Sequence, residues 1–70
     1  MCLSIPAEVL SVNGDTAEVS IGGTIYKAGL QMLENVSVGE FILLHAGFAI
    51  QKISKEEAEY TLKLLRDVNL

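Results

Sequence analysis

Residues 16–28 read TAEVSIGGTIYKA, and this stretch decides the fold class. Every second residue from Ala17 to Ile21 is apolar, which is the period of a half-buried strand. Gly22-Gly23 is typical of a tight turn, and residues 24–28 can pair back as a further strand before Gly29 ends the run. The stretch therefore predicts a β-hairpin in a mainly β protein.

The β pattern continues toward the N-terminus. Residues 5–12, IPAEVLSV, are rich in Val, Ile and Leu, and Pro6 suits the start or the edge of a strand because proline cannot donate to a ladder. Asn13-Gly14-Asp15 follows, and Asn-Gly readily adopts the positive φ angles of a tight hairpin turn. We therefore predict a meander of three strands.

Toward the C-terminus, residues 30–40 have no consistent period, which predicts an irregular connection with at most one helical turn. FILLHA, residues 41–46, is a continuous apolar run that suits a strand covered on both faces, and FAIQKI, residues 48–53, follows it. A bulge or a sharp bend at Ala46-Gly47 would allow both pieces to remain extended.

The last segment, SKEEAEYTLKLLRDV, changes to a helical period. Its apolar stripe consists of Ala58, Leu62, Leu65 and Val68, widened by Tyr60 and Leu64. Ser54 and Glu57 have the S-x-x-E spacing of a capping box, in which each side chain bonds a free backbone amide of the other residue. We predict a single domain, with a β-barrel over about residues 1–53 and an amphipathic helix over about residues 54–68.

The composition is that of one small globular domain. The chain has 70 residues, of which 50% are hydrophobic and 20% charged, so a packed core is expected. A single cysteine cannot make an internal disulfide, and no Cys and His cluster offers a closed structural metal site. The apolar runs are too short to span a membrane and the start lacks the basic region of a signal peptide, so we expect a cytoplasmic protein without a membrane partner.

The charge balance argues against a nucleic-acid partner. The net charge is −4 with a pI near 4.7, which opposes the phosphate contacts that dominate nucleic-acid affinity. Only 6% of the residues are aromatic, so stacking platforms for bases are also lacking.

Cys2 and His45 are the two residues that can carry chemistry. Removal of the initiator methionine would leave the Cys2 thiol beside a positive α-amino group, and a neighbouring cation favours the thiolate that attacks electrophiles and binds soft metals. The alternative is a terminal thiol without a role. His45 is the only histidine, and it is either a hydrogen-bonded structural residue or, if it lies near Cys2, a proton acceptor or second metal ligand.

Three segments together resemble the HypC/HupF family of hydrogenase maturation chaperones: MCLSIP at the start, VGEFILLHAGFAI near the middle, and SKEEAEYTLKLL at the helix. The resemblance implies a small OB-like β-barrel with a C-terminal α-helix, and a carrier in place of an enzyme. It implies two partners, a HypD-like iron–sulfur scaffold protein and the precursor of the [NiFe]-hydrogenase large subunit. The cargo would be iron as Fe(CN)2CO, with Cys2 and His45 as the candidate iron-binding residues.

Two other functions stay open on the sequence. One is an OB-like binding module without a metal role. The acidic charge and the low aromatic content argue against nucleic acid as the ligand of such a module. The other is a thiol enzyme that uses Cys2 and His45, although no orienting third group or substrate pocket is evident. One thiolate and one imidazole cannot fill the coordination sphere of iron, so in the carrier hypothesis a partner protein supplies the remaining ligands.

Overall fold

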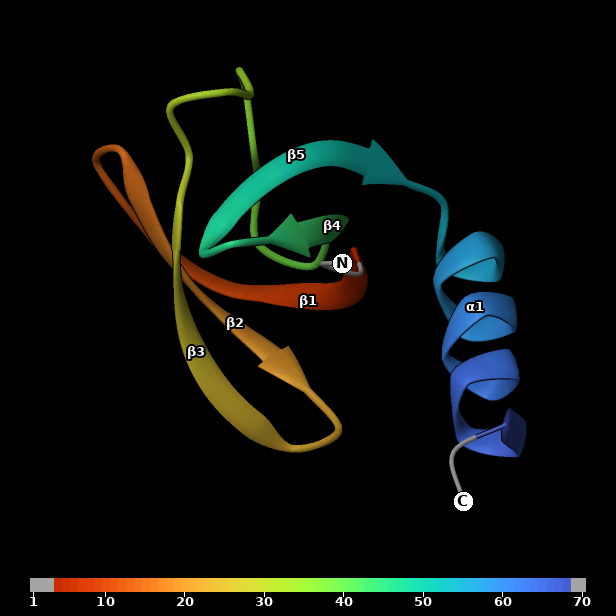
Figure 1. The fold of residues 1–70 in the computed structure, drawn as a ribbon. Helices are drawn as coiled ribbons and strands as arrows, with labels where there is room; N and C mark the ends of the chain where they lie inside the picture. The colour runs from red at the N-terminus through yellow and green to blue at the C-terminus, as the bar shows by residue number, and fades with distance from the viewer. Residues whose placement is uncertain (1–3, 69–70) are drawn as a thin grey trace.

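The computed structural model describes residues 4–68 and shows a closed β-barrel with one helix after it (Figure 1). The elements are β1 (Ile5–Asn13), β2 (Thr16–Ile21), β3 (Thr24–Gly29), β4 (Phe41–His45), β5 (Phe48–Ile53) and α1 (Lys55–Val68). The strands follow one another around the barrel in the order β1-β2-β3-β5-β4, and β1 pairs with β4 to complete the ring. The expected fold class, an OB-like β-barrel with a C-terminal helix, is confirmed.

The hairpin of β2 and β3 forms where the sequence predicts it. Ile21 pairs with Thr24 across a two-residue turn, and Gly22 and Gly23 both have positive φ, at 56° and 87°. This is the backbone of a type I′ turn, whose twist matches that of paired strands. Along β2 the inward residues follow the predicted alternation, and Val19 is completely buried.

The first hairpin differs by one position from the predicted one. Asn13 is the last residue of β1 and pairs with Thr16, so the turn consists of Gly14 and Asp15. Only Gly14 has a positive φ, at 64°, as in a type II′ turn, and the side chain of Thr16 donates a hydrogen bond to the Asn13 carbonyl at 3.0 Å. The predicted hairpin turn at Asn13-Gly14-Asp15 is confirmed, but its two central residues are Gly14 and Asp15 and not Asn13 and Gly14, because the ladder extends through Asn13.

The break at Ala46-Gly47 is a tight turn between antiparallel neighbours. His45 pairs with Phe48, and Ala46 and Gly47 are the two residues between them. The irregularity in this ladder lies elsewhere, at the step from Leu43 to Leu44. The predicted sharp bend at Ala46-Gly47 between two extended pieces is therefore confirmed, but the expectation that β4 is covered on both faces is wrong, since Ile42 is buried and the other residues of β4 are only half-buried.

The core lies inside the barrel and is made largely of small side chains. Its members are Ala7, Val9, Ala17, Val19, Ala28, Leu30, Ile42 and Ala49. The contact that closes the barrel is short: β3 pairs with β5 at Gly29 and Phe48, and the Gly29 amide donates to the Gly47 carbonyl at 2.8 Å. A Cβ on Gly29 would lie 2.8 Å from Cδ1 of Phe48, so this position has room only for glycine beneath the ring.

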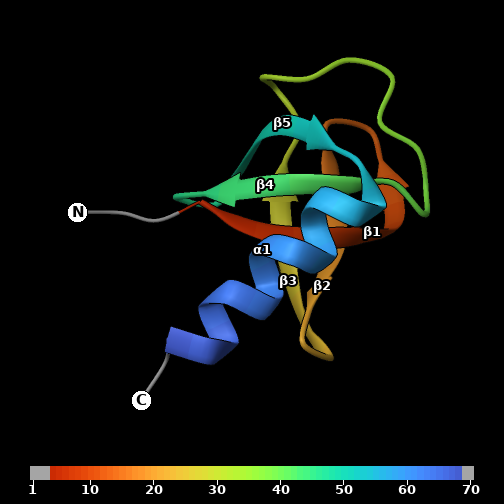
Figure 2. The same cartoon turned by 90° about the vertical axis from the view of Figure 1, so that its right-hand side faces the viewer.

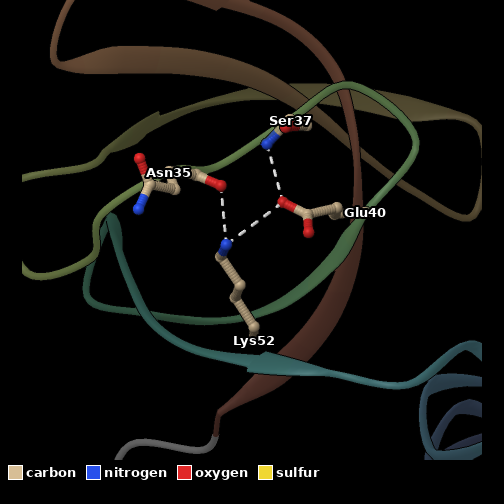
Figure 3. Close-up of polar contacts among 4 residues, drawn as sticks. All are labelled: Asn35, Ser37, Glu40 and Lys52. Atoms are coloured by element: carbon tan, nitrogen blue, oxygen red, sulfur yellow. Dashed lines mark hydrogen bonds and ion pairs between the residues drawn. The ribbon is translucent and has the colours of Figure 1, made fainter.

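The connection between β3 and β4 is irregular, as predicted, and polar contacts tie it to β5 (Figure 3). The Lys52 ammonium donates to the Asn35 carbonyl at 2.6 Å and lies 3.5 Å from Oε1 of Glu40. The same carboxylate oxygen accepts a hydrogen bond from the Ser37 amide at 2.7 Å. One lysine on β5 therefore holds two points of the connection.

The helix begins with the predicted capping box. The Glu57 amide donates to Oγ of Ser54 at 3.0 Å, and the Ser54 amide donates to Oε1 of Glu57 at 3.1 Å. The first half of α1 lies against β1 and β4, while its C-terminal end extends beyond the barrel (Figures 1 and 2). Ala58 is fully buried, whereas Leu62 and Leu65 are half-buried. Within residues 4–68, no helix has the length and apolar character needed to cross a membrane.

Candidate functional site

His45 is the last residue of β4, and it lies at the end of the barrel where β1 begins. The register of β1 against β4 pairs Ile5 with Leu44, the residue just before His45. Figure 2 shows the start of β1 and the end of β4 at the same end of the barrel. The start of β1, at Ile5 and Pro6, therefore pairs with the end of β4, the strand that ends at His45, although the two are far apart in the chain.

The imidazole of His45 is only half-buried, but its Nδ1 atom is shielded from solvent. Among residues 4–68, this atom has no hydrogen-bond partner. A buried polar atom without a partner is uncommon in native proteins and costs stability. Within the described residues, this position of the ring is thus left without a donor or an acceptor.

The turn after His45 has a strained backbone. Ala46 has φ 54° and Gly47 φ 85°, so both central residues of the turn have positive φ. Positive φ is easy for glycine but uncommon for alanine, because of the Cβ atom. Strained positions of this kind cluster at functional sites. The turn holds His45 opposite Phe48, whose ring is 41% exposed beside Gly29.

Cys2, the other predicted site residue, lies outside the described residues. The structure therefore places His45 but gives no distance between the two. Ser4 directly precedes Ile5, the residue that pairs with Leu44.

Other parts of the barrel offer weaker sites. No group of three or more His, Asp or Glu side chains able to hold a metal ion occurs within residues 4–68. A pocket of about 300 Å³ lies between the β1–β2 turn and the connection after β3, lined by residues that include Asp15, Leu33 and Val36. A second pocket of about 330 Å³ includes Glu18 and Lys27 in its lining. Neither lining includes His45.

The sequence did not reveal the geometry around His45. It singled out the histidine but not the positive φ of Ala46, nor the closing contact of Phe48 with Gly29. The only available signal was the Ala-Gly pair between two apolar runs, and alanine is not a residue that marks a tight hairpin turn.

Comparison with known proteins places this geometry in a functional context. The model of the HupF/HypC family matches residues 1–65. The chain is similar to proteins named hydrogenase maturation factor HypC: that of Rhizobium leguminosarum bv. viciae is 40% identical over 68 residues, covering 96% of this chain and 91% of the relative. The HypC of Synechocystis sp. is 40% identical, and the match covers 89% of this chain and 90% of the relative. The HypC of Escherichia coli K12 is 28% identical, and the match covers 97% of this chain and 82% of the relative. These relatives are maturation factors by name, in agreement with the expectation of a protein that is not an enzyme.

Proposed function

The chain belongs to the HupF/HypC family, and on this basis we propose that it is a hydrogenase maturation chaperone of the cytoplasm. In this proposal it holds the Fe(CN)2CO group together with a HypD-like iron–sulfur scaffold protein. It then delivers the group to the precursor of the [NiFe]-hydrogenase large subunit. The family match over residues 1–65 supports the maturation role, and the surroundings of His45 support the position of the cargo.

The single structural observation that carries the proposal is the buried Nδ1 atom of His45, which lacks a partner among residues 4–68. Histidine is a common metal ligand, and the hydrogen bond made by one ring nitrogen normally decides which nitrogen binds the metal. Here the described residues leave that choice open. A ligand that arrives with a partner protein would satisfy the atom.

Cys2 supplies the second donor in this proposal. A thiolate is a soft ligand and an imidazole suits iron, so the pair is chemically appropriate for an iron group that carries cyanide and carbon monoxide. Two donors leave the iron open to ligands from the scaffold protein and later from the precursor. Incomplete coordination is a useful property in a carrier, because the group has to leave.

The proposal is tested with Cys2→Ser and Cys2→Ala in a host that depends on this protein for hydrogenase activity. Among the residues that the structure describes, the buried ones lie between Pro6 and Ala58, so the melting temperature of both variants should match that of the wild type. Maturation should be lost, because neither an oxygen nor a methyl group replaces a soft thiolate. Full hydrogenase activity with Cys2→Ala would rule out the carrier mechanism.

The alternative of an OB-like binding module without a metal role predicts a different result. In that case neither Cys2 variant changes the amount of iron that remains with the protein. Anaerobic purification with the scaffold protein, followed by infrared detection of bound cyanide and carbon monoxide, distinguishes the two. Loss of those bands in Cys2→Ala, with the protein complex still formed, supports the metal role.

A further inference from the structure

In the part of the chain that the structure describes, the outer edge of β3 lacks a partner over most of its length. On one side β3 pairs with β2 from end to end, but on the other it meets β5 only where Gly29 pairs with Phe48. Within residues 4–68, no strand pairs with that side of β3 between Thr24 and Ala28. Figure 1 shows that the β2–β3 hairpin extends away from the barrel, with β3 on its outer side.

The register identifies the backbone groups on this edge. The Gly29 amide points away from β2, because it donates to the Gly47 carbonyl. Backbone direction alternates along a strand, so Lys27 and Ile25 also direct their amide and carbonyl groups away from β2. These are two donors and two acceptors on an exposed strand. Ile25 and Tyr26 are 59% and 47% exposed beside them.

We propose that this edge binds the same edge of a second copy of the chain, as an antiparallel β3–β3 pair with Tyr26 on the two-fold axis. In this register Ile25 of each copy forms a hydrogen-bonded pair with Lys27 of the other, and all the outward groups of both residues are used. Neither neighbouring register does so. One pairs Lys27 with Gly23 in the turn, and the other needs the Gly29 amide, which already donates to Gly47.

The side chains on this edge are compatible with the self-pairing. The two Tyr26 rings form a non-hydrogen-bonded pair, in which side chains lie closest, and aromatic pairs of this kind stabilise sheets. Each Tyr26 also lies beside the buried Val19 of its own β2. On the other face Ile25 lies opposite the aliphatic part of Lys27, so no like charges are opposed. The two-fold pairing ends at the dimer, because each copy uses its one β3 edge and leaves none for a third copy.

The size of the contact predicts a reversible dimer. Stable dimers bury about 20–30 residues on each side, far more than one strand edge offers. A net charge of −4 on each copy also opposes association at low ionic strength. The monomer and the dimer should therefore exchange, with the dimer favoured as the protein concentration rises.

Two substitutions of opposite charge at one position test the register. Sedimentation velocity of the full chain over a hundredfold range of concentration should show a rising sedimentation coefficient. Ile25→Lys places a lysine opposite Lys27 of the second copy, twice across the axis, and should weaken the dimer about tenfold. Ile25→Glu places opposite charges together and should strengthen it. An unchanged monomer at every concentration would overturn the proposal, as would equal effects of the two variants.

The matched controls are Ile50→Lys and Ile50→Glu, since Ile50 is an exposed apolar residue on β5, at 37% exposure. Neither should change the dimer constant. Amide NMR shifts of the wild type provide a second readout that needs no variant. With rising concentration the amides of Ile25 and Lys27 should move downfield as they become hydrogen-bonded. A dimer in which these two amides do not move uses another surface, and that result would also overturn the proposal.

Discussion

At the scale of single residues, His45 is the side chain whose surroundings depart most from those of an ordinary core residue. Its Nδ1 atom is buried without a partner among the described residues. Loss of solvent without a replacing hydrogen bond is costly, so this arrangement does not serve the stability of the free protein. In the function proposed above, the cost is recovered when the imidazole binds a ligand.

His45→Leu separates the two roles of this residue. Leucine has a similar size and no polar atom. The free energy of unfolding of the variant, measured by urea denaturation, should therefore equal that of the wild type or exceed it by up to about 1–3 kcal/mol. Hydrogenase maturation should be lost because no ligand remains at this position. His45→Gln is the control that keeps a polar end, and it should not gain stability. A destabilised His45→Leu that still supports maturation would show that the histidine is structural.

At the scale of elements, the sequence predicted the strands and the helix better than the turns that join them. The alternation in β2, the Gly-Gly turn and the capping box at Ser54 are local patterns that the structure confirms. The Ala46-Gly47 turn is different, since alanine has no local preference for positive φ. The sequence located the bend at Ala46-Gly47, but the positive φ of Ala46 is imposed by the pairing of β4 with β5 and not by the preference of alanine.

Ala46→Asn tests the strain in the turn. Asparagine tolerates positive φ better than alanine, so the free energy of unfolding should rise by about 1 kcal/mol. In a domain of this size the melting temperature should then rise by about 4–8 °C. Gly47→Ala is the control with the opposite sign, because it adds a Cβ at φ 85° where no other atom lies within 4 Å. A lower melting temperature for Ala46→Asn would mean that the alanine methyl makes a packing contact that outweighs the strain.

The helix offers a graded test of its apolar stripe. The predicted apolar stripe includes Ala58, Leu62 and Leu65, of which the structure buries Ala58 fully and the two leucines only in part. Leu62→Ala should therefore cost about 1–2 kcal/mol, less than a core leucine. Leu64 is 46% exposed, so Leu64→Ala should lower the free energy of unfolding by less than about 0.5 kcal/mol. Equal losses in urea denaturation would show that α1 packs on the barrel through a different face.

At the scale of the whole molecule, the barrel depends on a contact that no local pattern predicts. Gly29 and Phe48 belong to strands separated in the chain by the irregular connection and by β4. The sequence predicted the candidate site as two residues, Cys2 and His45, and it predicted a barrel without the order of its strands. That β1 and β4 are neighbours, which places His45 beside the start of β1, emerged only from the assembled sheet.

Gly29→Ala tests the closing contact. The new Cβ would lie 2.8 Å from Cδ1 of Phe48 and 2.5 Å from Oε1 of Gln31, so the ring and the amide must move. We expect the free energy of unfolding, measured by thermal denaturation, to fall by about 1–3 kcal/mol, as for other overpacked sites. Phe48→Ala removes the ring. The free energy of unfolding lost in the double variant should therefore be smaller than the sum of the losses in the two single variants. Additive losses would mean that the ring is not what the methyl group meets.

The short contact between β3 and β5 also determines which motions are easiest in this molecule. The Gly29 amide should exchange with deuterium through a small opening of this contact, whereas the Val19 amide in the β2–β3 ladder requires a larger unfolding event. The acceptor of the Gly29 bond is Gly47, in the turn that follows His45. Each opening releases that turn from β3. We therefore expect His45 to reorient at the rate at which this backbone hydrogen bond opens, which is faster than global unfolding of the barrel.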